Sequence, residues 1–137
     1  MARRLPELEP RLRLSFGGRV FGPGKAELLG HIAATGSISR SAARMEMSYN
    51  RAWLLVREMN LLFRGPLVAA VRGGKDGGGA RLTQAGEEVL RRYLRMEAAC
   101  LRAARPEWAA LRRRLRAQVT RAAGAGGGEP RGRGSFP

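Results

Sequence analysis

Polar and basic residues cluster near the start of a predicted helix that spans residues 49–63. Two of them, Asn50 and Arg51, are of the types that form paired hydrogen bonds with base edges, asparagine with adenine and arginine with guanine. The residues expected to face bases are Ser48, Tyr49, Asn50, Arg51, Leu54 and Arg57. Their chemistry is recognition by hydrogen bonding and apolar contact, and it indicates binding of a nucleic acid.

A second set of residues is suited to phosphate. The residues expected to contact phosphates are Ser37, Ser39, Arg40, Arg72 and Lys75. The first three begin a short helix, where hydroxyls, amide groups and the helix dipole favour an anion. The last two lie in residues 72–79, a segment with five glycines that let the backbone approach a phosphate closely. A nucleotide-binding P-loop does not fit this segment, because Asp76 follows Lys75 and the segment leads into a strand.

A helix–turn–helix over residues 35–59 positions the base-facing residues. Ser37 or Ser39 caps its first helix and Ser48 caps its second, because a serine hydroxyl accepts a hydrogen bond from a free amide group at a helix start. The apolar residues that recur at steps of three and four, and so predict a buried stripe, are Ala52, Val56, Met59 and Phe63. Trp53 is assigned to the core, near the edge of the base-facing surface. The second helix of such a motif lies in the DNA major groove.

Strands and one more helix complete the predicted domain. Alternating apolar residues predict a strand over 11–16, and Pro23 opens a helix that Gly36 ends. Short apolar runs at 67–71 and 80–83 enclose the glycine-rich segment, so they predict a β-hairpin directly after the helix–turn–helix. The pattern therefore predicts a mainly α fold with a small β-hairpin, arranged as a winged helix–turn–helix.

Long C-terminal helices follow the predicted hairpin. Thr83 caps a helix that Pro106 interrupts, and a further helix is expected over 107–122. These helices carry more apolar surface than a small domain needs, so we expect them to form the interface of a homodimer. The expected interface residues are Leu90, Tyr93, Leu94, Leu101, Trp108, Leu111 and Leu115. The predicted organisation is a flexible arm over 1–10, a DNA-binding domain over 11–83, dimerisation helices over 84–123 and a disordered tail over 124–137.

The charge of the chain indicates a polyanionic partner. Its 137 residues include 26 lysines and arginines against 11 aspartates and glutamates, a net charge of +15, and such an excess is typical of nucleic-acid binding. The lone Cys100 and the lone His31 lack the partners that a metal site or a catalytic relay needs, which argues against an enzyme. No apolar run is long enough to span a membrane, so we expect a cytoplasmic protein. The partner that we expect from the positive charge is double-stranded DNA.

The chain also resembles a known family, the DNA-binding domain of the molybdate-responsive regulator ModE, which is related to the LysR-type winged helix. The resemblance lies in three runs that occur in the same order: HIAATGSISRSAARMEMSYNRAW, VREMN and GGKDGGGARLT. It covers about Lys25 to Leu101 and implies a transcription regulator that binds DNA as a dimer. Nothing after Pro106 reads as the strands of the molybdate-binding domains of that family, so a stand-alone DNA-binding member is expected.

Two alternatives stay open at this point. A nonspecific nucleic-acid-binding protein, of the nucleoid or RNA-binding type, would have the same positive charge. A metal or oxyanion sensor would need a site created at the dimer interface. No cofactor is expected, with molybdate, tungstate and nickel left open as effectors.

Overall fold

The computed structural model describes residues 7–72 and 79–116 of the chain. Residues 10–100 form one compact unit, and residues 101–116 with residues 7–9 belong to a second. The elements are β1 (Leu14–Phe16), β2 (Arg19–Phe21), α1 (Pro23–Thr35), α2 (Ile38–Arg44), α3 (Tyr49–Leu62), β3 (Val68–Val71), β4 (Gly79–Leu82), α4 (Gln84–Leu111) and the short 3-10 helix η1 (Arg112–Arg114). The predicted mainly α class with a small β-hairpin is confirmed.

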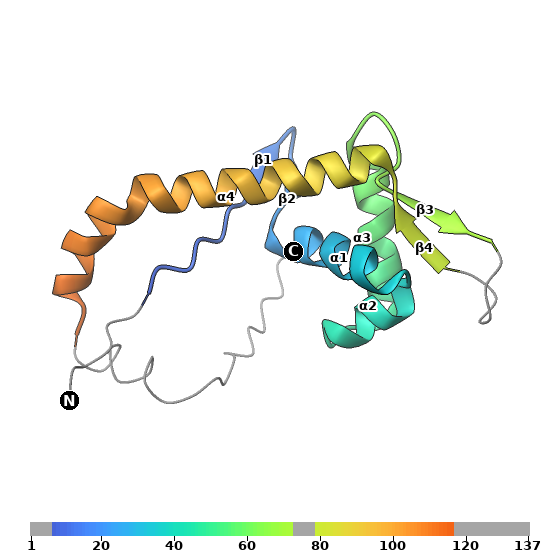
Figure 1. Cartoon of the computed structure of the whole chain (residues 1–137), viewed down its shortest axis with the longest axis horizontal. Coiled ribbons are helices and arrows are strands. Elements are labelled where there is room, and N and C mark those ends of the chain that lie inside the picture. The colour runs from blue at the N-terminus through green and yellow to red at the C-terminus, as the bar shows by residue number, and fades with distance from the viewer. Residues whose placement is uncertain (1–6, 73–78, 117–137) are drawn as a thin grey trace. The chain divides into compact units, whose positions relative to one another are not determined.

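The core of the first unit lies where α1, α2 and α3 pack together with the strands of the β3–β4 hairpin, which projects to the side of the helices in Figure 1. The predicted stripe on α3 is buried at Ala52, Val56 and Met59. Phe63, just past the helix, is half-buried, and its ring makes a T-shaped contact with that of Phe21 at a centroid distance of 5.8 Å. The other fully buried large side chains include Leu28, Leu29 and Ile32 of α1 and Leu67 before β3.

Side-chain caps fix where the helices begin. Ser37 Oγ accepts a hydrogen bond from the Arg40 amide at 3.1 Å, and Ser48 Oγ accepts one from the Arg51 amide at 3.2 Å. Gly36 ends α1 with a φ of 67°, a left-handed conformation that favours glycine. These caps were predicted from the sequence, and they hold α2 and α3 in the order and spacing of a helix–turn–helix.

The N-terminal strand is half of a hairpin that the sequence did not predict. β1 is shorter than the strand expected over 11–16, and it pairs antiparallel with β2 in the register Leu14 to Phe21. Gly17 and Gly18 make the two-residue turn with φ values of 56° and 73°, the conformation that such turns require. The pairing delivers Phe21, which is fully buried, into the core.

Helix α4 does not break at Pro106, and the prediction of two separate helices is wrong. A proline inside a helix removes one N–H and crowds the carbonyl four residues earlier. Both Pro106 and Arg102 are exposed, so water can satisfy the carbonyl that loses its partner and the disruption stays local. Of the helix expected over 107–122, only residues 107–116 are described, and α4 ends within them at Leu111.

Tyr93 anchors α4 to the first unit. It is 1% exposed, its hydroxyl donates to the Leu12 carbonyl oxygen at 2.6 Å, and its ring packs edge-on against Phe21 at 5.4 Å. Burial, and then the nearby Glu97 carboxylate, raises the pKa of Tyr93 to about 12. The expectation that this ring faces a second protomer is therefore corrected: it lies in the core of its own chain.

Candidate nucleic-acid interface

The exposed side of α3 carries all the residues expected to face bases. Ser48, Asn50, Arg51 and Arg57 are exposed, and Tyr49 and Leu54 are 53% and 52% exposed. The opposite side of the helix is buried in the core. Because that side is fixed, the direction in which the outer side chains point is fixed as well.

Trp53 belongs to this exposed side and not to the core, which corrects its assignment from the sequence. Its side chain is 44% exposed, and the guanidinium carbon of Arg57 lies 5.7 Å from its ring centroid. This cation–π contact restrains both side chains. The buried stripe runs through Ala52 and Val56, and Trp53, one position after Ala52, is turned about 100° away from it.

A groove of about 490 Å³ separates the exposed side of α3 from the β3–β4 hairpin. It is lined by four elements, and its lining residues are Ser37, Ile38, Ser39, Tyr49, Trp53, Val56, Asn60, Val68, Ala70, Gly79 and Ala80. The groove therefore brings together the start of α2, one edge of α3 and both strands of the hairpin.

Asn60 ties α3 to β3 at the bottom of this groove. Its side-chain carbonyl accepts hydrogen bonds from the amides of Leu67 at 2.8 Å and Val68 at 3.1 Å, and its amide group donates to the Val68 carbonyl at 3.1 Å. On the other strand, the Ala80 amide donates to the Gly36 carbonyl at 2.9 Å. Sequence reasoning missed Asn60, although a polar residue next to the buried Met59 is the signal that would have found it.

The residues expected to contact phosphate are less uniformly placed. Ser39 and Arg40 are exposed at the start of α2, whereas Ser37 is half-buried and its hydroxyl is used as the helix cap. Arg72 is exposed at the end of β3. Lys75 lies outside the described residues.

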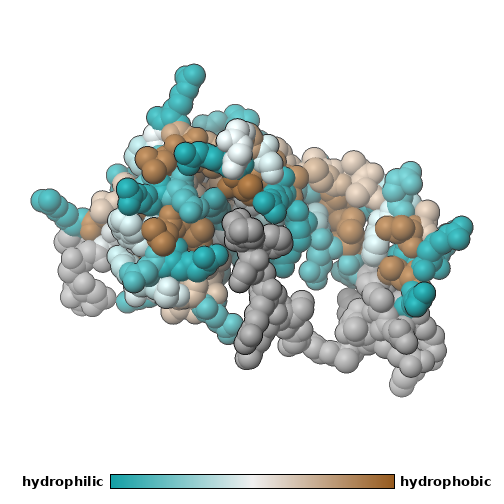
Figure 2. Space-filling view, turned by 180° about the vertical axis from the view of Figure 1, so that it is seen from behind, coloured by the Kyte–Doolittle hydropathy of each residue, from teal (hydrophilic) through white to brown (hydrophobic). Residues whose placement is uncertain are grey.

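The side chains that line the groove are uncharged, whereas arginines outnumber acidic residues in the elements that form it. Residues 37–72 and 79–82 hold seven arginines and two glutamates. One of these glutamates, Glu58, forms an ion pair with Lys25 at 3.3 Å. Figure 2 shows, on the face drawn there, separate hydrophobic patches set among hydrophilic side chains. Such a mixture suits a polyanion that offers apolar surface as well as charge.

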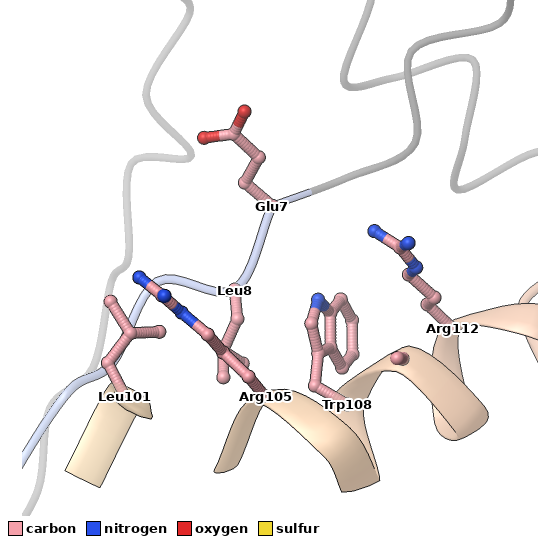
Figure 3. A pocket seen from close by; sticks show the side chains of 7 residues that line it. Glu7, Leu8, Leu101, Arg105, Trp108 and Arg112 are labelled. Atoms are coloured by element: carbon pink, nitrogen blue, oxygen red, sulfur yellow. The ribbon is translucent and has the colours of Figure 1, made fainter. Parts of the chain in front are cut away.

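The second unit contains a hollow of its own, about 390 Å³ in volume. Leu101, Arg105, Trp108, Ala109 and Arg112 line one side and Glu7 and Leu8 line the other (Figure 3). The buried indole nitrogen of Trp108 has no hydrogen-bond partner among the described residues. Within the described part of the chain there is no cluster of three or more metal-binding side chains, and none of the helices there is long and apolar enough to cross a membrane.

Apolar side chains of α4 stay uncovered by its own unit. Leu94 and Leu111 are 52% and 60% exposed, and Leu90, Leu101 and Trp108 are half-buried, as is Leu115 just after η1. Leu90, Leu94 and Ala98 form a shallow, mostly apolar groove edged by Glu87, Arg91 and Arg95. Along α4, Leu94, Leu101 and Trp108 recur every seven residues, the spacing that aligns side chains along one side of a helix in helix pairs.

No protein-family model matches the chain, but individual proteins do. The chain is 46% identical over 81 residues to the molybdenum-pterin-binding protein MopB of Rhodobacter capsulatus. This alignment covers 59% of the present chain and 30% of MopB. It is 45% identical over 71 residues to the DNA-binding transcriptional dual regulator ModE of Escherichia coli, and the alignment covers 52% of this chain and 27% of that protein. It is 41% identical over 88 residues to the transcriptional regulator ModE of Yersinia pestis, and the alignment covers 64% of this chain and 34% of that protein.

Two of these three relatives are ModE regulators, and the third is a molybdenum-pterin-binding protein. The aligned segment spans only about a third of the length of these curated relatives. About half of this chain is therefore similar to a segment of the ModE and Mop proteins.

Proposed function

We propose that this chain is a sequence-specific, DNA-binding transcriptional regulator that binds duplex DNA as a homodimer. The observation that carries the proposal is the exposure of every base-facing side chain of α3, on a helix whose other side is locked into the core. In this proposal α3 lies in the major groove and the β3–β4 hairpin is the wing of a winged helix.

Each group of residues has its own role in this proposal. Arg51 reads guanine and Asn50 reads adenine, because their side chains match the paired donors and acceptors of those bases. Ser39, Arg40 and Arg72 contact phosphates, which set the register of the protein on the duplex without reading sequence. Lys75 supplies a further phosphate contact from the segment between β3 and β4.

The relatives suggest what the regulation serves. Their names include a DNA-binding transcriptional regulator and molybdenum transport proteins. We therefore propose a role in metal or oxyanion homeostasis, with molybdenum favoured by these names, for a LysR-like winged-helix regulator of the cytoplasm. The aligned segment spans only about a third of those proteins. The relatives therefore do not give the effector of this chain, and any effector is part of the proposal.

Dimerisation through α4 fits the proposed mode of binding. Two-fold symmetric proteins read palindromic sites, with two identical helices one turn of DNA apart. The exposed Leu94 and Leu111 of α4, with the half-buried Leu90 and Leu101, are the surface that we assign to the partner protomer.

Selection of bound duplexes from a random library tests the proposal directly. We expect a palindromic consensus, and an Arg51→Ala variant that loses about 1–3 kcal/mol of binding free energy and relaxes specificity at one position in each half-site. Arg19→Ala, which removes an exposed arginine of β2, is the matched control and should leave the consensus unchanged. A library that shows no enriched sequence would contradict sequence-specific recognition.

The wing is tested by the salt dependence of binding. Lys75→Ala should weaken binding to all duplexes alike and reduce the slope of affinity against salt concentration by about one. The second candidate function, nonspecific nucleic-acid binding, is favoured by the net charge of +15. It predicts that random duplex competes as well as the selected sequence.

A further inference from the structure

An aromatic patch lies at the N-terminal half of α3. Tyr49, Trp53 and Leu54 are 53%, 44% and 52% exposed, and they occupy successive positions around one side of the helix. Contiguous apolar surface on a soluble protein marks a contact surface more often than an isolated exposed residue does. The patch therefore needs a partner, and its surroundings show which kind.

Trp53 forms part of the wall of the groove between α3 and the hairpin. Of the polar groups there, the Asn60 side chain is already bonded to the backbone of β3. Arg57 lies over the Trp53 ring, so the ring is restrained before any partner arrives. A side chain held in place in this way loses little conformational entropy on binding.

The groove is lined by uncharged side chains, but the elements that form it carry an excess of arginine, which favours a polyanion such as duplex DNA over an apolar protein surface. Seven arginines and two glutamates lie in residues 37–72 and 79–82, while Ser37 and Ser39 line the groove with hydroxyl groups. A DNA strand presents phosphates to such donors and the apolar faces of its sugars to an aromatic ring. An apolar protein surface offers the second of these features without the first.

We propose that Trp53 contacts DNA directly, with the sugar–phosphate backbone of one strand lying in the groove between α3 and the β3–β4 hairpin. The inference rests on the proposed function and adds a residue and a position to it. Trp53 supplies apolar contact to the deoxyribose rings, and Arg57 keeps the indole in the orientation that this contact uses.

The two tryptophans of the chain provide the test and its control. A Trp108→Phe variant leaves Trp53 as the sole indole, and a Trp53→Phe variant leaves Trp108, whose indole nitrogen is buried. Each variant is titrated with the selected duplex while the anisotropy of a labelled strand reports binding independently. Circular dichroism and thermal melting establish that both variants fold.

The expected result is protection of Trp53 alone. Acrylamide quenching of Trp53 should fall at least about twofold when the duplex saturates, because an interface excludes water from the side chains at its centre. Quenching of Trp108 should not follow the DNA titration. If anisotropy shows saturation while Trp53 stays as accessible as before, the contact is overturned and the proposed function stands.

Two further outcomes separate the alternatives. If no duplex binds, the proposed function fails and the contact fails with it. If Trp53 becomes protected as the protein concentration rises without DNA, the patch is covered by a second copy and the inference is overturned.

Affinity supplies a measurement that does not depend on fluorescence. In the otherwise unchanged chain, Trp53→Ala should weaken binding of the selected duplex roughly tenfold, since tryptophan is enriched among the residues that dominate interfaces. Trp53→Phe, which keeps an aromatic ring, should weaken it less. Equal affinities for all three proteins would overturn the proposal.

Discussion

Helices α3 and α4 both expose apolar side chains, but the two helices differ in how much of their length is buried against the rest of the chain. α3, with 14 residues, is buried along one side through Ala52, Val56 and Met59. α4, with 28 residues, has Gly86 and Tyr93 as its buried positions, both in its first half. The apolar residues exposed on α3 lie among arginines, whereas α4 carries four glutamates and five arginines along its length.

This difference shows why exposure alone does not identify a partner. A helix locked along one side keeps its outer side chains in fixed directions, which suits the reading of a rigid duplex. A long helix anchored near its start leaves apolar positions for another chain to cover, and mixed charge beside them suits a protein surface. The two helices therefore suit different partners, and four experiments test how each helix is held and what it contacts.

The largest effect is expected at the anchor of α4. A Cβ atom added at Gly86 would lie 2.1 Å from the Leu67 carbonyl oxygen, and a backbone atom cannot move aside cheaply. Gly86→Ala should lower the free energy of unfolding by about 3 kcal/mol, measured by urea denaturation. Gly30→Ala, in α1 with nothing within 4 Å of the added atom, is the control and should raise stability by about 0.5–1 kcal/mol. Equal effects at the two glycines would show that α4 is not anchored there.

Two asparagines on α3 separate its structural and recognition sides. Asn60→Ala leaves the amides of Leu67 and Val68 without their side-chain partner, so stability should fall by about 2 kcal/mol. Asn50→Ala removes an exposed side chain and should change stability by less than about 0.5 kcal/mol. In a DNA-binding assay we expect Asn50→Ala to lose affinity for the selected sequence. An Asn50 variant with unchanged affinity would remove that residue from the recognition surface.

An acidic residue in the exposed groove of α4 should dissociate the proposed dimer. Leu94→Glu places a charge where we expect a partner helix, so sedimentation equilibrium should show association weakened at least about tenfold. The monomer should unfold as before because Leu94 is 52% exposed. Leu61→Glu on α3, at a leucine that is 69% exposed, should leave association unchanged. The reverse pattern would move the dimer contact from α4 to α3.

The smallest effect concerns Tyr93 and pH. Its folded-state pKa of about 12 lies above the value of 10 for a free tyrosine, so the folded chain holds the proton more tightly. The stability due to this difference is present below pH 10 and is lost as pH rises from 10 towards 12. Tyr93→Phe should remove this alkaline loss and lower stability at neutral pH by about 1 kcal/mol, through the lost hydrogen bond to Leu12. A Tyr49→Phe control, at an exposed tyrosine, should retain the alkaline loss in the same melting experiments.

Local signals account for what the sequence predicted correctly. Ser37 and Ser48 cap helices through atoms three residues away, and the stripe on α3 depends on helical periodicity. Such features are written within a few residues of each other, so they can be recognised without knowledge of the rest of the fold.

Features set by distant residues were not predictable in the same way. Tyr93 finds its partners in Phe21 and in Leu12, which is 81 residues away in the chain. Without those contacts, the inner and outer sides of α4 look equally apolar. Trp53 was assigned to the core because a large aromatic residue usually is buried, and only the position of the buried stripe shows that it is not.

The two strands of the β3–β4 hairpin are tethered to different helices, β3 through Asn60 and β4 through the carbonyl of Gly36. A side chain at Gly79 would meet that carbonyl at 2.8 Å, so the second tether also restricts which residue can stand there. Both tethers hold residues of the strands themselves, outside the stretch that joins them. A change in the length or charge of that stretch therefore leaves both attachments to the helices in place, so this part of the chain can vary over generations without endangering the fold.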